Sequence, residues 1–331
     1  MAALALLLAA FAAAASTGTV TLAAAGDIRL DGPIAAVAKS GGPEAPSAEV
    51  RHLLEADIVH GNLETPVTTR GKKTDKTWNF RAHPRLLPIL RAAGFTVLTI
   101  ANNHVWDYGL EGFLDTVAAV KKGGWVMIGG GKDRAEAEKV RVVVKNGVKV
   151  GFVGLTSTNP KEGWAKPGKP GVAYSDFTRV AGVVAAAKQA CDVLVVSFHG
   201  GTELAEDPND IQKAVAHAAV DAGADLFLGH HPHVLQPVEV YKGKPIVYSL
   251  GNFLFVSPTP STRPTVVARA TLAADGVRRL EFHPVDGNWG RLKPAPNGGE
   301  VEAAARAALD RLGAFSAHPE LLSFVPTGPG S

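Results

Sequence analysis

Histidine, aspartate, glutamate and asparagine recur in this sequence just after short apolar runs. The densest group is His230, His231 and His233, which places three of the chain's 11 histidines within four positions. Imidazole is the commonest metal-ligating side chain near neutral pH. A polar turn whose histidines cap backbone groups would explain the same residues. The positions of the other polar residues along the chain distinguish these two explanations.

Five apolar runs end in residues that can donate an oxygen or an imidazole nitrogen. These are Asp27, Asn62 with Glu64, Asn103 with His104, His199, and His231 with His233. Ligands of α/β sheets bind beyond the carboxyl ends of the strands, so these side chains are expected to meet there. Mixed nitrogen and oxygen donors suit manganese, zinc or iron better than calcium or magnesium. The pattern predicts one or two divalent ions that activate water for displacement at phosphorus.

Some of these residues have a second explanation. Asp107 either orients the His104 imidazole or caps the helix expected to begin near Leu110. Asn62 and Asn103 also suit turn positions with left-handed backbone. Asp27 can hydrogen-bond turn amides, Glu64 can cap a turn, and His104 can be an interior histidine with satisfied nitrogens.

Short buried strands must position these residues. Strands are expected at 19–25, 57–60, 95–100, 125–128, 192–198 and 225–228, and helices at 48–55, 84–93, 110–122, 176–190, 208–222 and 300–312. Asn146-Gly147 and Lys242-Gly243 predict hairpins, and residues 265–272 and 278–284 a last strand pair. Early strands alternate with helices before hairpins take over, which predicts a layered α/β sandwich with mixed sheets.

Two segments lie outside this scheme. Residues 156–175 are rich in Gly, Pro and Lys, and form either a lid over the cleft or an ordinary surface loop. The tail from Ser316 is expected to be loose. Trp78, Trp106 and Trp164 line a cleft or pack in the core.

The composition is that of a globular protein. The 331 residues are 46% hydrophobic and 20% charged, which fits one large α/β domain with a substantial core. A net charge of +3 without a basic run gives no argument for a nucleic-acid partner. The single cysteine, Cys191, excludes an internal disulfide and a cysteine-based metal cluster, and is expected to be a buried structural thiol.

Residues 1–17 have the apolar core and small-residue end of a secretory signal peptide. They lack a positive region before that core. An apolar helix that stays attached to the protein is the alternative. Either way the protein is expected to be exported, to the periplasm, the extracellular space or the membrane surface.

Six segments in order resemble the CapA family, which is named for poly-γ-glutamate capsule synthesis and belongs to the calcineurin-like metallophosphoesterase superfamily. The segments are Ala25-Gly26-Asp27 and residues 61–66, 101–109, 199–203, 229–234 and 248–253. The resemblance implies an α/β/β/α sandwich of the metallophosphoesterase type. It divides the chain into a signal peptide over 1–17, a CapA-like domain over 18–290, and a C-terminal helix with a loose tail over 291–331.

The resemblance also implies roles for single residues. The implied metal ligands are Asp27, Asn62, Glu64, Asn103, His199, His231 and His233, and His230 replaces one of the last two if the register shifts. His104 resembles the histidine that protonates the leaving group. Two positions depart from the superfamily pattern: Arg29 replaces a histidine, and Asn62 replaces the metal-bridging aspartate. Arg29 can instead clamp an anionic substrate, because guanidinium binds carboxylate or phosphate bidentately.

The expected function is a metal-dependent, phosphoesterase-like hydrolase that makes, releases or anchors an anionic cell-surface polymer. The catalytic residues expected are His104, Asp107 and Arg29. The alternative is a non-catalytic binding or assembly component, which holds an acidic polymer or a phosphorylated, lipid-linked intermediate through Arg29 and loop lysines (Lys72, Lys73, Lys161 and Lys166). Membrane proteins of capsule synthesis are the expected protein partners. A cytoplasmic phosphatase is a third hypothesis, and depends on the protein not being exported.

Overall fold

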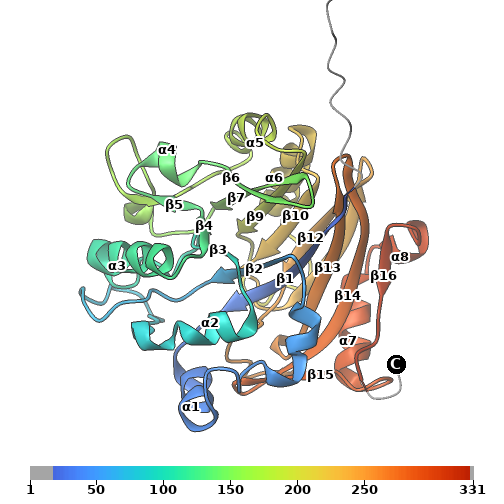
Figure 1. Ribbon diagram of the computed structural model, residues 1–331, viewed down its shortest axis with the longest axis horizontal. Helices are drawn as coiled ribbons and strands as arrows, with labels where there is room; N and C mark the ends of the chain where they lie inside the picture. The colour runs from blue at the N-terminus through green and yellow to red at the C-terminus, as the bar shows by residue number, and fades with distance from the viewer. Residues whose placement is uncertain (1–17, 329–331) are drawn as a thin grey trace, which may run out of the picture.

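Two mixed β-sheets pack face to face in the computed structural model, which describes residues 18–328 (Figure 1). The larger sheet has eight strands. Their order is β15 (Arg291–Pro294), β14 (Gly276–Asn288), β13 (Pro264–Ala273), β1 (Val20–Ile28), β2 (Ile58–Leu63), β3 (Val97–Thr99) and β4 (Val126–Ile128), with β16 (Leu322–Phe324) paired to β14. Strands β1 to β4 run parallel, and the hairpin strands β13 to β15 extend the sheet antiparallel.

The second sheet has six strands. Their order is β11 (Leu235–Tyr241), β12 (Lys244–Leu250), β10 (Leu226–His230), β9 (Val193–His199), β7 (Val148–Thr156) and β6 (Arg141–Lys145). The central strands β7, β9, β10 and β12 are parallel, and the two edges are antiparallel hairpins. Their turns fall at Asn146-Gly147 and Lys242-Gly243, as the sequence predicts. A separate two-stranded ribbon joins β5 (Gly130–Gly131) to β8 (Gly171–Val172).

Helices cover the outer face of each sheet. The first sheet is covered by α1 (Gly32–Gly41), α2 (Pro88–Ala93), α3 (Gly109–Lys122) and two 3₁₀ helices, η1 (Ala48–Leu54) and η2 (Pro84–Leu86). The second is covered by α4 (Arg134–Ala137), α5 (Val180–Lys188) and α6 (Asp210–Asp221). Further 3₁₀ turns are η3 (Lys161–Gly163) and η4 (Pro260–Thr262). The predicted α/β/β/α layering is confirmed.

The core between the sheets explains why the central strands are apolar on both faces. Leu22, Phe152 and Leu228 are fully buried between the sheets, while Phe198 and Phe227 lie under the helices on the outer face. A strand covered on both faces cannot alternate between polar and apolar residues. Polar side chains can therefore be placed only at the end of such a strand.

The C-terminal segment closes one side of the sandwich. Helices α7 (Glu300–Leu309) and α8 (Ala314–Ala317) lie beside β14 and β16 at the right of Figure 1. The expectation of a loose tail from Ser316 is wrong for residues 322–324, because β16 pairs in parallel with β14 and buries Leu322.

Two other expectations differ from the structure. Residues 48–54 form a 3₁₀ helix, and the helix expected at 176–190 is shorter, Val180–Lys188. It begins late because Asp176 accepts hydrogen bonds from the backbone and hydroxyl of Thr178, which fixes a turn there. The predicted signal peptide lies outside the described residues. Within residues 18–328, no helix has the length and apolar character needed to cross a membrane.

Candidate metal centre

The carboxyl ends of strands from both sheets meet at one edge of the sandwich. Asp27 on β1 lies opposite Asn62 on β2, and His199 on β9 lies opposite His230 on β10. The end of β12 approaches β1 closely: Asp27 donates its backbone N–H to the Gly251 carbonyl at 2.9 Å. A Cβ added to Gly26 would lie 2.0 Å from that carbonyl, so only glycine allows this approach.

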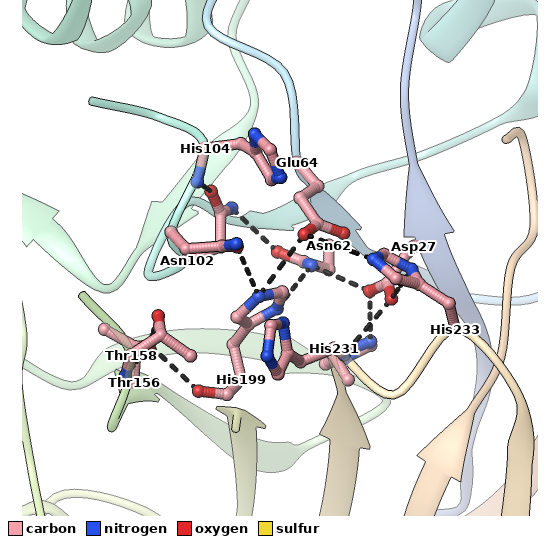
Figure 2. A network of polar contacts seen from close by, with 12 residues as sticks. Asp27, Asn62, Glu64, Asn102, His104, Thr156, Thr158, His199, His231 and His233 are labelled. Atoms are coloured by element: carbon pink, nitrogen blue, oxygen red, sulfur yellow. Dashed lines mark hydrogen bonds and ion pairs between the residues drawn. The ribbon is translucent and has the colours of Figure 1, made fainter. Parts of the chain in front are cut away.

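Carboxylates and imidazoles converge at this edge in three overlapping groups. Glu64, His199 and His231 form one group, and Asp27, Glu64 and His233 form a second. The third joins Glu203 to His231 and His233. Within each group the potential ligand atoms lie within 4.8 Å of one another. Figure 2 shows the Glu64 carboxylate facing the His199 and His231 rings, with Asp27 and His233 to one side.

The burial and hydrogen bonding of the Glu64 carboxylate indicate whether these residues suit a bound cation. Its side chain is fully buried, and neither carboxylate oxygen has a hydrogen-bond partner among residues 18–328. Burial, followed by the charge of Asp27, holds the pKa of Glu64 well above its ordinary value. Two imidazole nitrogens lie near Glu64 Oε1, His199 Nε2 at 3.4 Å and His233 Nε2 at 4.0 Å, without forming a hydrogen bond. An ionised carboxylate without hydrogen bonds is costly in an interior, and a divalent cation offsets that cost. The donor set therefore fits a metal ion.

The neighbouring imidazoles divide into neutral and charged forms. Burial and the His233 charge lower the pKa of His231 to about 3, and burial lowers that of His199 well below its ordinary value. Burial opposes protonation of His233, but the carboxylates of Glu64 and Asp27 prevail and raise its pKa to about 9. Burial likewise opposes ionisation of Asp27, yet hydrogen bonds from His230 and His233 hold its pKa well below the ordinary value. His199 and His231 are thus in the neutral form that binds metals.

Asn62, an implied metal ligand, contacts three polar side chains of the site. Its amide nitrogen donates to Asp27 Oδ1 at 2.8 Å and lies 3.0 Å from His199 Nδ1. Its amide oxygen accepts from Asn102 Nδ2 at 3.0 Å. In this arrangement Asn62 bridges Asp27 and His199 as a hydrogen-bond donor, which an aspartate at the same position could not do.

Asn103 and Asn102 have separate contacts. Asn103 Oδ1 lies 2.9 Å from His199 Nε2, so Asn103 reaches the cluster as predicted. Asn102 Oδ1 accepts the backbone N–H groups of His104 and Val105, at 3.1 and 2.9 Å. Asn102 therefore fixes the turn that presents His104.

His104 is held by a carboxylate and an aromatic ring. Its Nδ1 lies 2.7 Å from Asp107 Oδ2, and Phe80 stacks on its ring at 3.8 Å. Asp107 also accepts from Phe80 N and from Lys76 Nζ, both at 2.6 Å. Of the two explanations for Asp107, the geometry favours orientation of His104, since α3 begins after Tyr108 without a side-chain cap.

Arg29 lies beside the cluster rather than in it. Its guanidinium pairs with Asp31 and stacks on Phe80, 3.9 Å from the ring centroid. His230 is fully buried behind the cluster, with Nδ1 3.3 Å from Asp27 Oδ1, and joins none of the three groups. His231 and His233 have positive φ angles, 98° and 60°, and this unusual backbone turns their rings toward the carboxylates.

Two cavities border the cluster and share no lining residue. The larger, of about 720 Å³, is lined by Lys76, Asn103, Trp106 and His231, and by Ser157–Pro160 of the long loop. The smaller, of about 340 Å³, is lined by residues that include Arg29, Trp78, His104 and His233. Trp164 is not among the residues that line these two cavities. Its ring stacks on Tyr174, and its indole N–H donates to the Thr158 carbonyl.

Sequence reasoning assigned no role to four residues that contact the site. Lys76, Phe80 and Asn102 hold His104 or its partners, and Asn252 Oδ1 lies 2.9 Å from His233 Nδ1. Asn102 and Asn252 belong to segments that carry the family resemblance, which is a signal that could have identified them. Lys76 and Phe80 lie in or next to a polar loop, where no such signal is present.

Comparisons with known proteins show the fold and the family of this chain. A hypothetical protein from Thermus thermophilus has a similar fold, with a TM-score of 0.50 and 16% identity over 80% of this chain and 99% of that one. The "PGA biosynthesis protein CapA" of Bacillus subtilis (strain 168) is 37% identical over 79% of this chain and 70% of its own length. The "Capsule biosynthesis protein CapA" of Bacillus anthracis is 35% identical over 73% of this chain and 61% of its own length. Residues 21–257 match the family described as bacterial capsule synthesis protein PGA_cap, and the chain belongs to that family.

Proposed function

We propose that this protein is a metal-dependent hydrolase that acts on a phosphoester or related acyl bond in the synthesis, release or anchoring of an anionic capsule polymer. The polymer class is suggested by the names of the Bacillus relatives, which refer to poly-γ-glutamate and capsule biosynthesis. The hydrolytic part of the proposal depends on the site. Its strongest support is Glu64, whose buried oxygens have no hydrogen-bond partner among residues 18–328 and face neutral imidazoles.

Asp27, Glu64, His199, His231 and His233 would hold the ion or ions, with Asn103 alongside. A bound divalent cation of this kind activates water and stabilises negative charge that develops on the substrate. The other residues prepare the site for that chemistry. Asn62 fixes the spacing of Asp27 and His199, and Asp107 holds the His104 ring through Nδ1. The remaining ring nitrogen, Nε2, is then the atom that delivers a proton to the leaving group.

The test is metal analysis and turnover on the same preparation. Purified protein is expected to hold about one to two equivalents of manganese, zinc or iron and to hydrolyse an aryl phosphate. His231→Ala should lower bound metal and reduce kcat/KM at least about 100-fold. His217→Ala is the matched control, because His217 lies on α6 and contacts Glu239 away from the cluster. Absence of bound metal, with equal activity in both variants, would rule out the proposal.

A second candidate is a binding or assembly component without turnover. It is favoured by Asn62, whose amide nitrogen, a hydrogen-bond donor, points at Asp27 and His199 where the superfamily has a ligand oxygen. In this case Arg29→His combined with Asn62→Asp should create phosphatase activity that the wild type lacks. Brisk hydrolysis by the wild type would exclude this candidate.

Export, and partnership with membrane proteins of capsule synthesis, belong to the same proposal. They are supported by the apolar sequence of residues 1–17 and by the family membership. Fractionation of cells that express the full chain with an intact amino terminus tests export directly. Recovery of the protein only in the cytoplasm would leave the hydrolase without a role at the cell surface.

A further inference from the structure

The smaller cavity beside the cluster has apolar walls. Its lining includes Trp78, Phe80, Leu204, Phe255, Val256 and Pro258. Polar groups from Arg29, Glu203, Asn252 and Thr262 complete it. The larger cavity is lined by more polar residues, Lys76, Asn103 and Asn209 among them, together with Trp106, Pro160 and Ile211. The two sides of the cluster therefore suit chemically different groups.

Two walls of the smaller cavity expose large apolar side chains. Trp78 is 69% exposed and Leu204 is 57% exposed. Leu204 has a φ of 61°, an unusual conformation for a residue with a Cβ, and is held there by a 2.8 Å hydrogen bond from its N–H to the Pro232 carbonyl. The same loop that carries His231 and His233 thus positions Leu204. Apolar surface gathered around a hollow next to reactive groups is typical of a ligand site.

Two imidazoles of the site, His104 and His233, line this cavity, and each lies beside an aromatic ring. Phe80 stacks on His104, and the Phe255 ring lies 4.8 Å from that of His233. A general acid must lie within hydrogen-bond reach of the leaving-group atom that it protonates. His104 lines the smaller cavity, whereas Lys76, Asn103 and His231 line the larger one. The leaving group therefore belongs on the apolar side.

We propose that the smaller cavity binds an apolar leaving group, an alkyl or isoprenoid-type chain, joined to the substrate through an ester oxygen. This inference depends on the proposed hydrolysis. Water adds to the phosphorus or acyl carbon, the bond to the ester oxygen breaks, and His104 gives its proton to that oxygen. His104 regains a proton from the attacking water, and the chain leaves as an alcohol. The anionic part remains on the polar side.

The test is equilibrium binding of two phosphonates that cannot be hydrolysed at the carbon–phosphorus bond. Calorimetric titration of the full-length protein, supplied with manganese, should give a Kd for octylphosphonate at least about tenfold below that for methylphosphonate. Leu204→Asn should abolish most of this preference, and because the change is neutral it should lower the affinity for methylphosphonate far less. Asparagine is tolerated at a positive φ better than leucine, so the variant is expected to fold.

Ile211→Asn is the matched control, because Ile211 is 51% exposed and lines the larger cavity. It should retain the preference for octylphosphonate. Equal affinities for the two phosphonates, no binding of octylphosphonate, or the same loss in both variants would overturn the inference. Hydrolysis without a chain preference would remove this inference alone. A chain preference without hydrolysis would remove the proposed turnover and retain the apolar site.

Discussion

Glu64 illustrates how one residue can destabilise the fold while serving the site. Its carboxylate is fully buried and has no hydrogen-bond partner within residues 18–328. Asp27, buried nearby, accepts hydrogen bonds from Asn62 Nδ2 at 2.8 Å and from the backbone N–H of His231 at 3.1 Å. A buried carboxylate without such hydrogen bonds is retained at a cost to stability, which is typical of a residue that binds a cation.

Replacement of Glu64 should therefore separate stability from metal binding. In the presence of a chelator, Glu64→Gln is expected to be more stable than the wild type by about 1–3 kcal/mol, because the amide avoids the cost of burying an ionisable carboxylate that accepts no hydrogen bond. Added manganese or zinc should raise the Tm of the wild type but not that of the variant. Thermal melts with and without chelator measure both effects. A variant that is less stable than the wild type without metal would contradict this account of Glu64.

At the scale of elements, the site depends on how closely β1 approaches the end of β12. Asp27 N donates to the Gly251 carbonyl, and Phe253 N donates back to the Asp27 carbonyl, both at 2.9 Å. These bonds join the first sheet to the second at the point where the ligands gather. The approach is possible because Gly26 has no side chain.

Gly26→Ala is expected to destabilise the protein by about 2–4 kcal/mol and to lower metal affinity. The added methyl group would lie 2.0 Å from backbone that cannot rotate away. Gly182→Ala is the control: it lies inside α5, where an added Cβ meets nothing within 4 Å. That change should stabilise the protein by about 0.5–1 kcal/mol. Urea unfolding measures both, and equal effects would refute the close-approach argument.

Asp225 anchors the strand that carries the histidine cluster. It is 4% exposed and accepts from Lys188 Nζ at 2.6 Å, Lys244 Nζ at 2.7 Å and Leu194 N at 2.9 Å. It thereby ties the start of β10 to α5, β9 and β12. Burial opposes ionisation, but these bonds hold the pKa of Asp225 below its ordinary value of 3.8.

The pH dependence of this anchor follows from the direction of the shift. Because the folded pKa is depressed, the stabilisation is present above pH 3.8 and is lost as the pH falls through the folded pKa. Asp225→Asn should cost about 2–4 kcal/mol at pH 7 and progressively less below pH 3.8. Asp221→Asn, whose partner Lys242 is largely exposed, should cost under about 0.5 kcal/mol at any pH. Unfolding by urea at pH 7 and pH 3 distinguishes the two.

At the scale of the whole molecule, α7 completes the core between the sheets. Ala305 and Leu309 are fully buried and belong to the same apolar cluster as Leu22 and Leu228. Residues beyond 290 also supply β15 and β16 to the first sheet. The C-terminal segment is therefore part of the sandwich that holds the strand ends in place.

Leu309→Ala is expected to cost about 2–4 kcal/mol, because it leaves a cavity between the sheets. Leu312→Ala is the control, since Leu312 is 56% exposed, and it should change stability by less than about 0.5 kcal/mol. Differential scanning calorimetry compares the two variants. If both had the same small effect, α7 would not be an integral part of the core.

The sequence by itself determined the layers and the location of the site. Strands buried on both faces must be apolar along their length, so their polar residues collect at the ends, and a regular chain order places those ends at one edge. For that reason Asp27, Glu64, His199, His231 and His233 were predicted together, and the structure brings them together. The C-terminal strand β16 was missed, because three residues carry too little periodicity to predict a strand.

Only the tertiary structure decided how each polar residue is used. The role of Asn62 could not be assigned from sequence, because its amide group can donate or accept hydrogen bonds. In the structure, Asp27, His199 and Asn102 fix the orientation of that amide. Arg29 pairs with Asp31 and stacks on Phe80, a contact across about fifty residues of chain. Residue type and strand order act locally and can be predicted from the sequence. The hydrogen-bond or ion-pair partner of each polar side chain depends on which residues folding brings together. The local sequence does not specify these contacts.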